Sequence, residues 1–396
     1  MSTLPPTASG SRLYALDWLR VIAFGLLILY HIGMFFVPSD WHLKTAAPVE
    51  ALEYPMSLLN AWRLGLLFFI SGVAMRFLLD KQGADQFAGS RTYRLLPVIL
   101  FGMIVIVAPQ TYFELRQADA IGADYLAFWA RYLSEVEING ITVPTWNHLW
   151  YVVYLFVYAL LLAAFARPLT SLGNSRVGRG FERAWQGLGG AVLLLILPAM
   201  PFILFRFALD PYFETTHNLI WDWATHARSI TIFLIGFYAA KSAAFWRAVQ
   251  GTWIAAGLLS VVYAGLLAVV WRVDASVWED GAWFVWPIRL LRIFYGWWAI
   301  VFLLGAAQRF LSSDGPRLRY LNEAVFPLYI FHQTLTVAAG YWVSTQTLPL
   351  VFEFGVLLVV TVGGSLIGVE LAKRTGPLRL LFGLKPSRRS PEALSA

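Results

Sequence analysis

Three ionisable side chains lie inside one long apolar stretch near the start of the chain. Residues 13–36 read LYALDWLRVIAFGLLILYHIGMFF, which is long enough to cross a bilayer as one helix. The stretch carries Asp17, Arg20 and His31, and at about 100° per residue these fall within a sector about 60° wide on one helix face. Because an ionisable group inside a membrane costs at least about 2.5 kcal/mol, we expect this stripe to face a polar cavity or a partner helix.

The spacing along the stripe indicates what each residue can do. Asp17 and Arg20 are one turn apart, which predicts an ion pair, whereas Arg20 and His31 are separated by about 16 Å along the helix and cannot touch. A histidine, with a reference pKa of about 6.5, can accept a proton at neutral pH. The three residues are therefore candidate catalytic residues. The alternative is purely structural, an internal ion pair with a histidine bonded to a neighbouring helix.

The composition excludes an ordinary soluble globular protein. Hydrophobic residues make up 59% of the 396 positions, and only 13% are charged. This balance predicts an all-α fold, a polytopic membrane helix bundle, in a lipid bilayer. Because the chain has no cysteine, it has no disulfide, thiol nucleophile or thiolate metal ligand.

Apolar runs predict ten spans, centred at about residues 25, 68, 101, 157, 199, 237, 262, 299, 333 and 361. Connections rich in arginine and lysine alternate with connections rich in acidic residues, so the positive-inside rule places both termini in the cytoplasm. We expect one transmembrane domain over residues 1–384 and a short basic disordered tail over residues 385–396. In the longest outer connection, residues 125–133 (YLAFWARYL) predict a short amphipathic helix.

Two further groups of polar residues interrupt the apolar runs in the first third of the chain. In the second span, Arg63 is able to hold a carboxylate or phosphate, and the alternative is that its side chain snorkels outward. Ser71 lies near the middle of the same span. Before the third span, Arg91 and Arg94 are one turn apart at the cytoplasmic boundary. Such a pair suits phosphate binding, although positive-inside bias alone also explains it.

The later spans add two histidines, a tryptophan and a glutamate. His148 and Trp150 lie at the outer start of the fourth span, where an aromatic belt is the simpler explanation, and His332 lies near mid-membrane in the ninth. With Arg63 and Ser71, these are candidates for binding a ligand. Glu370 lies at about the depth of Asp17 and Arg20 and is able to complete their ion-pair network.

Familiar soluble motifs are absent from the sequence. There is no GxxxxGK[ST] loop, HExxH pair or GxSxG elbow, and the six histidines lack close metal-ligand spacing. We expect no metal, no permanently bound cofactor and no nucleic-acid partner. The oligomeric state is left open.

A set of motifs distributed over nearly the whole chain resembles the acyltransferase-3 family of integral membrane acyltransferases. The motifs are LDWLR followed by YHI, then FFISG, RTYR, HLWYVVYL, LYIFH and VELAKRTGPLRLLFGLKP. The first is the most specific, because Arg20 and His31 reproduce the family's spacing of arginine, ten residues and histidine. RTYR matches its paired arginines. One departure is Val325, where relatives often have serine, which weakens assignments around His332.

The resemblance implies an enzyme of the bacterial cytoplasmic (inner) membrane. Acyl-CoA, as succinyl-CoA or acetyl-CoA, would be the co-substrate from the cytoplasm, and a hydroxyl of a periplasmic glucan or other glycan would be the acceptor. Succinyl transfer to a glucan is favoured, with acetyl transfer to another cell-surface glycan as the alternative. His31 would be catalytic, and Arg91, Arg94 and Arg20 would bind coenzyme A. The candidates for binding the acceptor or the acyl group would be Arg63, Ser71, His148, Trp150 and His332. The family's frequent extra hydrolase-like domain is missing from this sequence, so direct transfer is the simpler scheme.

The competing class is a transporter or flippase, in which the same charges form a relay or substrate path. A purely structural scaffold is disfavoured by the number of charges inside spans. Hydrolysis or transfer of acyl groups from acyl-CoA by the purified protein discriminates between these classes.

Overall fold

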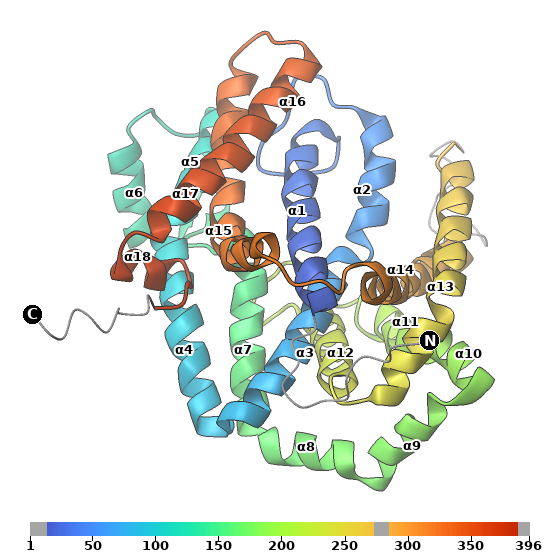
Figure 1. The fold of residues 1–396 in the computed structure, drawn as a ribbon. Coiled ribbons are helices and arrows are strands. Elements are labelled where there is room, and N and C mark those ends of the chain that lie inside the picture. The colour runs from blue at the N-terminus through green and yellow to red at the C-terminus, as the bar shows by residue number, and fades with distance from the viewer. Residues whose placement is uncertain (1–13, 273–284, 387–396) are drawn as a thin grey trace, which may run out of the picture. The chain divides into compact units, whose positions relative to one another are not determined.

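The computed structural model describes residues 14–272 and 285–386, and these are almost entirely helical (Figure 1). In these two ranges the strands are β1 (Glu137–Ile138) and β2 (Ile141–Thr142), which form one small antiparallel hairpin. The predicted all-α fold is therefore confirmed. Residues 387–396 of the predicted disordered tail lie outside the described residues.

Most of the predicted spans correspond to long apolar helices. Within the described part of the chain, eight segments are long and apolar enough to cross a membrane: Tyr14–Phe36, Glu50–Gln82, Ala84–Gln117, Asn147–Ala164, Gly189–Ala208, Ala243–Val270, Trp286–Phe310 and Leu350–Ala372. The other two predicted spans are also helices, α12 (Trp223–Ala239), of only 17 residues, and α15 (Pro316–Ser344), which carries polar side chains at its centre. The cytoplasmic placement of the termini stays a prediction.

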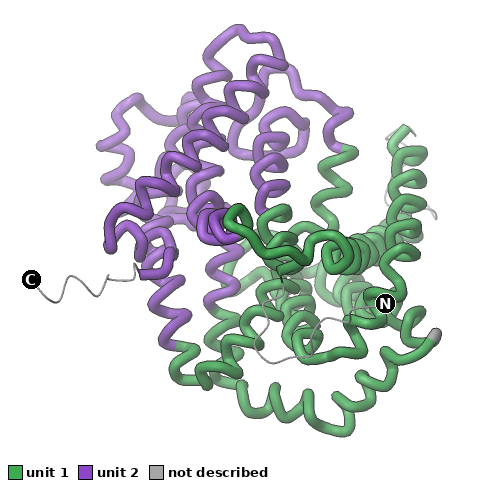
Figure 2. Tube along the Cα trace, in the orientation of Figure 1, with its two compact units in different colours: residues 1–23, 54–88, 157–318 green, residues 24–53, 89–156, 319–396 purple. Residues whose placement is uncertain are grey.

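The chain divides into two compact units, which Figure 2 shows in different colours. Unit 1 contains residues 14–23, 54–88 and 157–318, and unit 2 contains residues 24–53, 89–156 and 319–386, apart from the undescribed residues 273–284. Five helices are divided between the units along the sequence: α1 (Tyr14–Phe36), α2 (Glu53–Asn60, only its first residue in unit 2), α4 (Ala84–Phe101), α7 (Trp150–Ala164) and α15.

Unit 1 is built around closely packed helix pairs. A Cβ atom at Gly72 of α3 would lie 1.9 Å from the carbonyl oxygen of Phe233 in α12, and one at Gly236 of α12 would lie 2.1 Å from that of Phe69. The two glycines thus let these backbones touch, as small residues do between membrane helices. The helices that lie wholly within unit 1 are α3 (Arg63–Gln82), α8 (Ala166–Asn174), α9 (Arg176–Ala184), α10 (Gly187–Ile196), α11 (Met200–Ala208), α12, α13 (Ala243–Val270) and α14 (Val285–Phe310).

The second half of α1 is held in the core of unit 2. Ile32 and Phe35 are fully buried and pack with Val337 of α15 and Leu357 of α16. This apolar packing fixes the side of α1 on which His31 must lie. The other helices of unit 2 are α5 (Ala108–Gln117), α6 (Tyr125–Ser134), α16 (Leu350–Leu358), α17 (Gly364–Ala372) and α18 (Gly376–Leu381).

A lysine from the following loop caps the end of α1. The Nζ atom of Lys44 donates hydrogen bonds to the carbonyl oxygens of Met34 at 2.7 Å and Val37 at 3.0 Å, and also to that of Ser39. Helix α1 has no basic residue in its own last turn, so Lys44 supplies the positive charge that the carbonyl end favours. Burial nevertheless lowers the pKa of Lys44.

The segment between α5 and α7 has its own small core. The predicted helix in this segment is confirmed as α6, and the Asp124 carboxylate accepts a hydrogen bond from the backbone N–H of Ala127 at 3.0 Å as its N-cap. Tyr132 is fully buried, and the carbonyl oxygens of Met103 at 3.0 Å and Thr145 at 3.3 Å share the single proton of its hydroxyl. Burial raises the pKa of Tyr132 to about 12.

Candidate active site

Two histidines that are 301 positions apart in the sequence meet in unit 2. The Nδ1 atom of His31 on α1 lies 2.7 Å from the Nε2 atom of His332 on α15. Their rings stack, with centroids 5.0 Å apart and an angle of 23° between the planes. His332 is fully buried. Each residue is a separate candidate in the sequence, and the fold brings the two into one site.

A backbone carbonyl determines which nitrogen of each histidine carries a proton. The Nδ1 atom of His332 lies 2.6 Å from the carbonyl oxygen of Tyr329, which can only accept a hydrogen bond, so this nitrogen is the donor. In a neutral His332 the Nε2 atom is then an acceptor, and the Nδ1 atom of His31 donates to it. The lone pair of a neutral His31 is therefore on Nε2, the atom able to accept a proton.

His148 lies beside this pair but is held in another way. Its Nε2 atom donates to the carbonyl oxygen of Ile330 at 3.1 Å, and its Nδ1 atom accepts from the Gln110 amide at 3.3 Å. Its ring packs edge-on against His332 with centroids 5.3 Å apart. With both nitrogens in hydrogen bonds, His148 shapes the site and is a weaker candidate for contact with a substrate. Trp150, the other candidate from this motif, packs against Tyr154 with centroids 5.1 Å apart.

A network of amides and a carboxylate adjoins the histidines, and it was not predicted from the sequence. Glu114 accepts a hydrogen bond from the Nδ1 atom of His42 at 2.5 Å. The side-chain amide of Gln333 donates to the Nε2 atom of His42 at 3.0 Å and to the Oε1 atom of Gln110 at 3.2 Å. The sequence feature that indicates this network is the polar run His332, Gln333 and Thr334 at the centre of an otherwise apolar span. The run does not reveal its hydrogen-bond partners, because these come from other elements.

The network is tied to an irregular turn before α5. The amide of Gln110 donates to the Thr334 hydroxyl at 2.7 Å, and this hydroxyl donates to the carbonyl oxygen of Ile106 at 2.6 Å. Ile106 ends a π-helical turn over Gly102–Ile106, a local geometry that recurs at functional sites. These bonds join α15 to the start of α5 and hold the neighbours of His332 in place.

The paired arginines of α4 have different surroundings. The Nε atom of Arg94 donates to the carbonyl oxygen of Gly383 at 3.1 Å, which ties α4 to the turn after α18. The Nε atom of Arg91 is buried and has no hydrogen-bond partner among the described residues. A ligand anion would satisfy this donor, so Arg91 is the stronger candidate for phosphate binding.

The candidates in unit 1 lie on α1 and α3. The predicted ion pair is confirmed, since an Nη atom of Arg20 lies 3.2 Å from a carboxylate oxygen of Asp17. Arg63 is only 2% exposed, so the alternative in which it snorkels outward is wrong. Ser71 is half-buried and adjoins Gly72 at the close approach of α3 and α12.

Glu370 has partners on its own part of the chain. It lies 3.0 Å from the Nζ atom of Lys373 and accepts a hydrogen bond from the Tyr320 hydroxyl at 2.8 Å. Its contact with the pair formed by Asp17 and Arg20 stays a prediction. No group of three or more His, Asp or Glu side chains in residues 14–272 and 285–386 is arranged to hold a metal ion.

Comparisons with known proteins agree with this arrangement of motifs. The chain is 22% identical over 381 residues to "Glucans biosynthesis protein C" of Escherichia coli O81 (strain ED1a), covering 95% of this chain and 96% of that protein. The protein of the same name from Escherichia coli O6:K15:H31 (strain 536 / UPEC) is 22% identical over 380 residues, again covering 95% and 96%. No solved structure matches the chain. The family model described as an acyltransferase domain matches residues 13–370, and the chain therefore belongs to the acyltransferase-3 family of membrane acyltransferases.

Proposed function

We propose that this protein transfers an acyl group from cytoplasmic acyl-CoA to a hydroxyl of a glycan on the outer side of the bacterial inner membrane. The observation that carries the proposal is the pair of histidines, in which the Tyr329 carbonyl orients His332 and His332 orients His31. A base that is oriented by a second group and presents a lone pair is the arrangement used for activating a hydroxyl.

The chemistry follows from the lone pair on His31. Its Nε2 atom takes the proton of the acceptor hydroxyl while that oxygen attacks the thioester carbonyl. The tetrahedral intermediate then expels the thiolate of coenzyme A, and the proton on His31 neutralises this leaving group. His332 accepts a hydrogen bond from the other nitrogen of His31 throughout, which stabilises the positive charge on the His31 ring. A positioned base of this kind contributes about 10²- to 10⁴-fold to the rate.

Arginines provide the donor site in this proposal. Arg91 is assigned to the phosphates of coenzyme A because its Nε atom is a buried donor whose partner would be supplied by the ligand. Arg94 is assigned to the same group, with a second role in holding Gly383. Arg20, held by Asp17, remains a donor-binding candidate, and Arg63 and Ser71 remain candidates for the acyl group or the acceptor.

The acceptor and the acyl group are inferred from relatives. The names of the Escherichia coli proteins refer to the biosynthesis of glucans, which supports a glucan acceptor. The family resemblance favours succinyl transfer, with acetyl transfer to another cell-surface glycan as the second candidate.

The test is acyl transfer by the purified protein with succinyl-CoA or acetyl-CoA and a glucan. A thiol reagent reports the released coenzyme A without background, because the chain contains no cysteine. We expect release that depends on the glucan, and a mass increase of the glucan by one acyl group. In His31→Gln we expect turnover to fall by about 10²- to 10⁴-fold while acyl-CoA binding is retained. Full turnover in this variant would remove the assignment of His31 as the base, and no release with either donor would contradict the use of acyl-CoA.

A further inference from the structure

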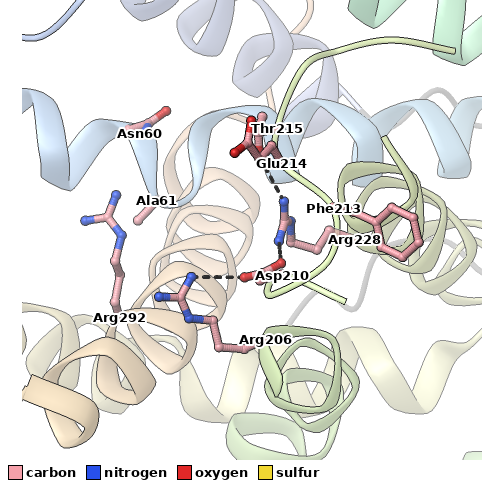
Figure 3. Close-up of a pocket in the computed structure, with 9 residues that line it drawn as sticks. All are labelled: Asn60, Ala61, Arg206, Asp210, Phe213, Glu214, Thr215, Arg228 and Arg292. Atoms are coloured by element: carbon pink, nitrogen blue, oxygen red, sulfur yellow. Dashed lines mark hydrogen bonds and ion pairs between the residues drawn. The ribbon is translucent and has the colours of Figure 1, made fainter. Parts of the chain in front are cut away.

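A polar cavity in unit 1 lies outside every group of residues discussed above. Its volume is about 520 Å³, and Figure 3 shows the side chains that line it. Among the lining residues that the structure describes are three arginines, Arg206, Arg228 and Arg292, and two acids, Asp210 and Glu214. The cavity is therefore lined mainly by groups that bind charged or hydroxylated ligands.

One side of the cavity is a compact cluster of opposite charges. The Asp210 carboxylate lies 3.0 Å from an Nη atom of Arg206 and also accepts a hydrogen bond from Arg228. Arg228 in addition donates to the Thr215 hydroxyl at 3.3 Å. A single carboxylate thus holds two guanidinium groups, so Arg206, Asp210 and Arg228 together keep a net charge of about +1.

The other side carries an arginine whose partners are uncharged. Arg292 comes from α14, and in Figure 3 it lies across the cavity from Asp210. It donates to the Ser57 hydroxyl at 2.7 Å. It makes no ion pair with a carboxylate among the described residues. Buried or half-buried guanidinium groups favour an anionic partner, and a hydroxyl satisfies only the hydrogen bond.

Neutral polar groups lie next to these charges. Asn60 lines the cavity on the side of Arg292, and Thr215 lines it beside Arg228. The volume is several times that of a single phosphate or carboxylate, so an anion alone would leave most of the space to water. The remaining amide, hydroxyl and carboxylate groups match the hydroxyls of a larger ligand. Glu214, which is exposed, adds a negative charge at this site and disfavours ligands with many anionic groups.

We propose that this cavity binds a ligand in which one oxyanion, a phosphate or a carboxylate, is attached to a group bearing several hydroxyls. The oxyanion lies between Arg292 and the cluster formed by Arg206, Asp210 and Arg228. Two sources share this chemistry, an acidic sugar in solution and the phosphoglycerol headgroup of an anionic lipid. The inference does not depend on the acyl-transfer chemistry, because none of its residues belongs to the histidine site.

The test measures binding to the full chain in nanodiscs at low ionic strength, where electrostatic contacts are least screened. The soluble probes are glucose 6-phosphate, inorganic phosphate and, as a neutral control, glucose. The lipid arm compares thermal unfolding in phosphatidylglycerol and phosphatidylcholine nanodiscs. The decisive variant is Arg292→Gln, because glutamine removes the guanidinium charge and keeps a polar side chain. The matched control is Arg289→Gln, one turn earlier on α14 and not among the lining residues.

An acidic sugar is supported if glucose 6-phosphate binds more tightly than glucose, and Arg292→Gln weakens its binding at least tenfold while Arg289→Gln does not. A lipid headgroup is supported if phosphatidylglycerol raises the unfolding temperature of the parent and of Arg289→Gln but not of Arg292→Gln. Ala61→Leu, which fills part of the cavity and keeps all three arginines, provides the same comparison if Arg292→Gln does not fold. The proposal is overturned if the parent and the folded variant, Arg292→Gln or Ala61→Leu, bind glucose 6-phosphate equally tightly and show the same change in unfolding temperature in phosphatidylglycerol.

Discussion

The Nδ1 atom of His31 and the Nε2 atom of His332 are 2.7 Å apart, and the opposite nitrogen of His332 is bonded to the carbonyl oxygen of Tyr329. The carbonyl sets the tautomer of His332, and His332 in turn sets that of His31. In the proposed reaction the two histidines therefore act as one unit, with His31 as the base and His332 as a positioning residue.

His332→Gln is expected to lower kcat by about 10- to 100-fold, which corresponds to losing one hydrogen bond of roughly 1–3 kcal/mol to the base. The KM for acyl-CoA is expected to stay within about twofold, because His332 has no assigned donor contact. Steady-state kinetics separate the two parameters. The matched control is His226→Gln, which alters a histidine in unit 1 that bonds to Tyr158. A kcat equal to that of the parent would show that His332 does not orient the base.

Arg91→Ala is expected to weaken acyl-CoA binding roughly 10- to 150-fold, because it removes a charge-assisted contact worth about 1.5–3 kcal/mol. Stability should change little, since its Nε atom bonds to no described residue. Arg94→Ala should weaken binding and also lower the unfolding temperature, because Arg94 holds Gly383. Calorimetric titration with coenzyme A, next to the exposed control Arg176→Ala, measures the first effect. Unchanged affinity for coenzyme A in a folded Arg91→Ala protein would mean that Arg91 and Arg94 reflect only the positive-inside bias of cytoplasmic connections.

Asp17→Asn tests the charged end of the stripe on α1. The side chains of Arg20 and Asp17 are 31% and 15% exposed, so the loss of their ion pair is expected to cost about 1 kcal/mol, well below the cost for a fully buried pair. Activity should fall more than stability, because Arg20 is then no longer held in place. Thermal unfolding and turnover are measured on the same preparation. Parental activity in a folded Asp17→Asn protein would mean that Arg20 has another partner, and Glu370 would be tested next.

The predicted topology is tested by single-cysteine labelling, which is clean because the chain has no native cysteine. Ser175 is the N-cap of α9, so the cysteine is better placed at the exposed neighbouring residue as Arg176→Cys. An impermeant reagent added outside intact cells is expected to leave this position unlabelled and to label Ala120→Cys in the predicted outer connection. Labelling of Arg176→Cys from outside would show that the orientation in the membrane is opposite to the predicted one.

Tyr132→Phe is expected to destabilise the segment between α5 and α7 by about 1–3 kcal/mol, because it leaves the half-buried carbonyl groups of Met103 and Thr145 without this donor. Tyr125→Phe is the matched control, since no hydrogen bond of its hydroxyl is recorded among the described residues. The Tyr132 pKa of about 12 lies above the usual value of 10.0, so its stabilisation is complete below about pH 10 and is lost as the pH rises through 12. Equal unfolding temperatures for the two variants at neutral pH would contradict this anchoring role.

The sequence alone predicted the features that depend on short-range geometry. Apolar runs of sufficient length must form helices in a bilayer, because only a helix satisfies its backbone hydrogen bonds within one segment, and each of the ten predicted centres lies in a helix. The ion pair between Asp17 and Arg20 was predictable for the same reason, since three residues along a helix is a fixed separation.

Contacts between distant segments were decided by the tertiary structure. Periodicity gives the face of a helix but not the neighbour that covers it, so the sequence named His31 and His332 without pairing them. It also missed His42, Glu114 and Gln333, whose hydrogen bonds join three separate segments of unit 2. The burial of Arg63 and the net charge of the cavity around Arg292 likewise depend on which helices pack together, and no local rule of sequence determines that packing.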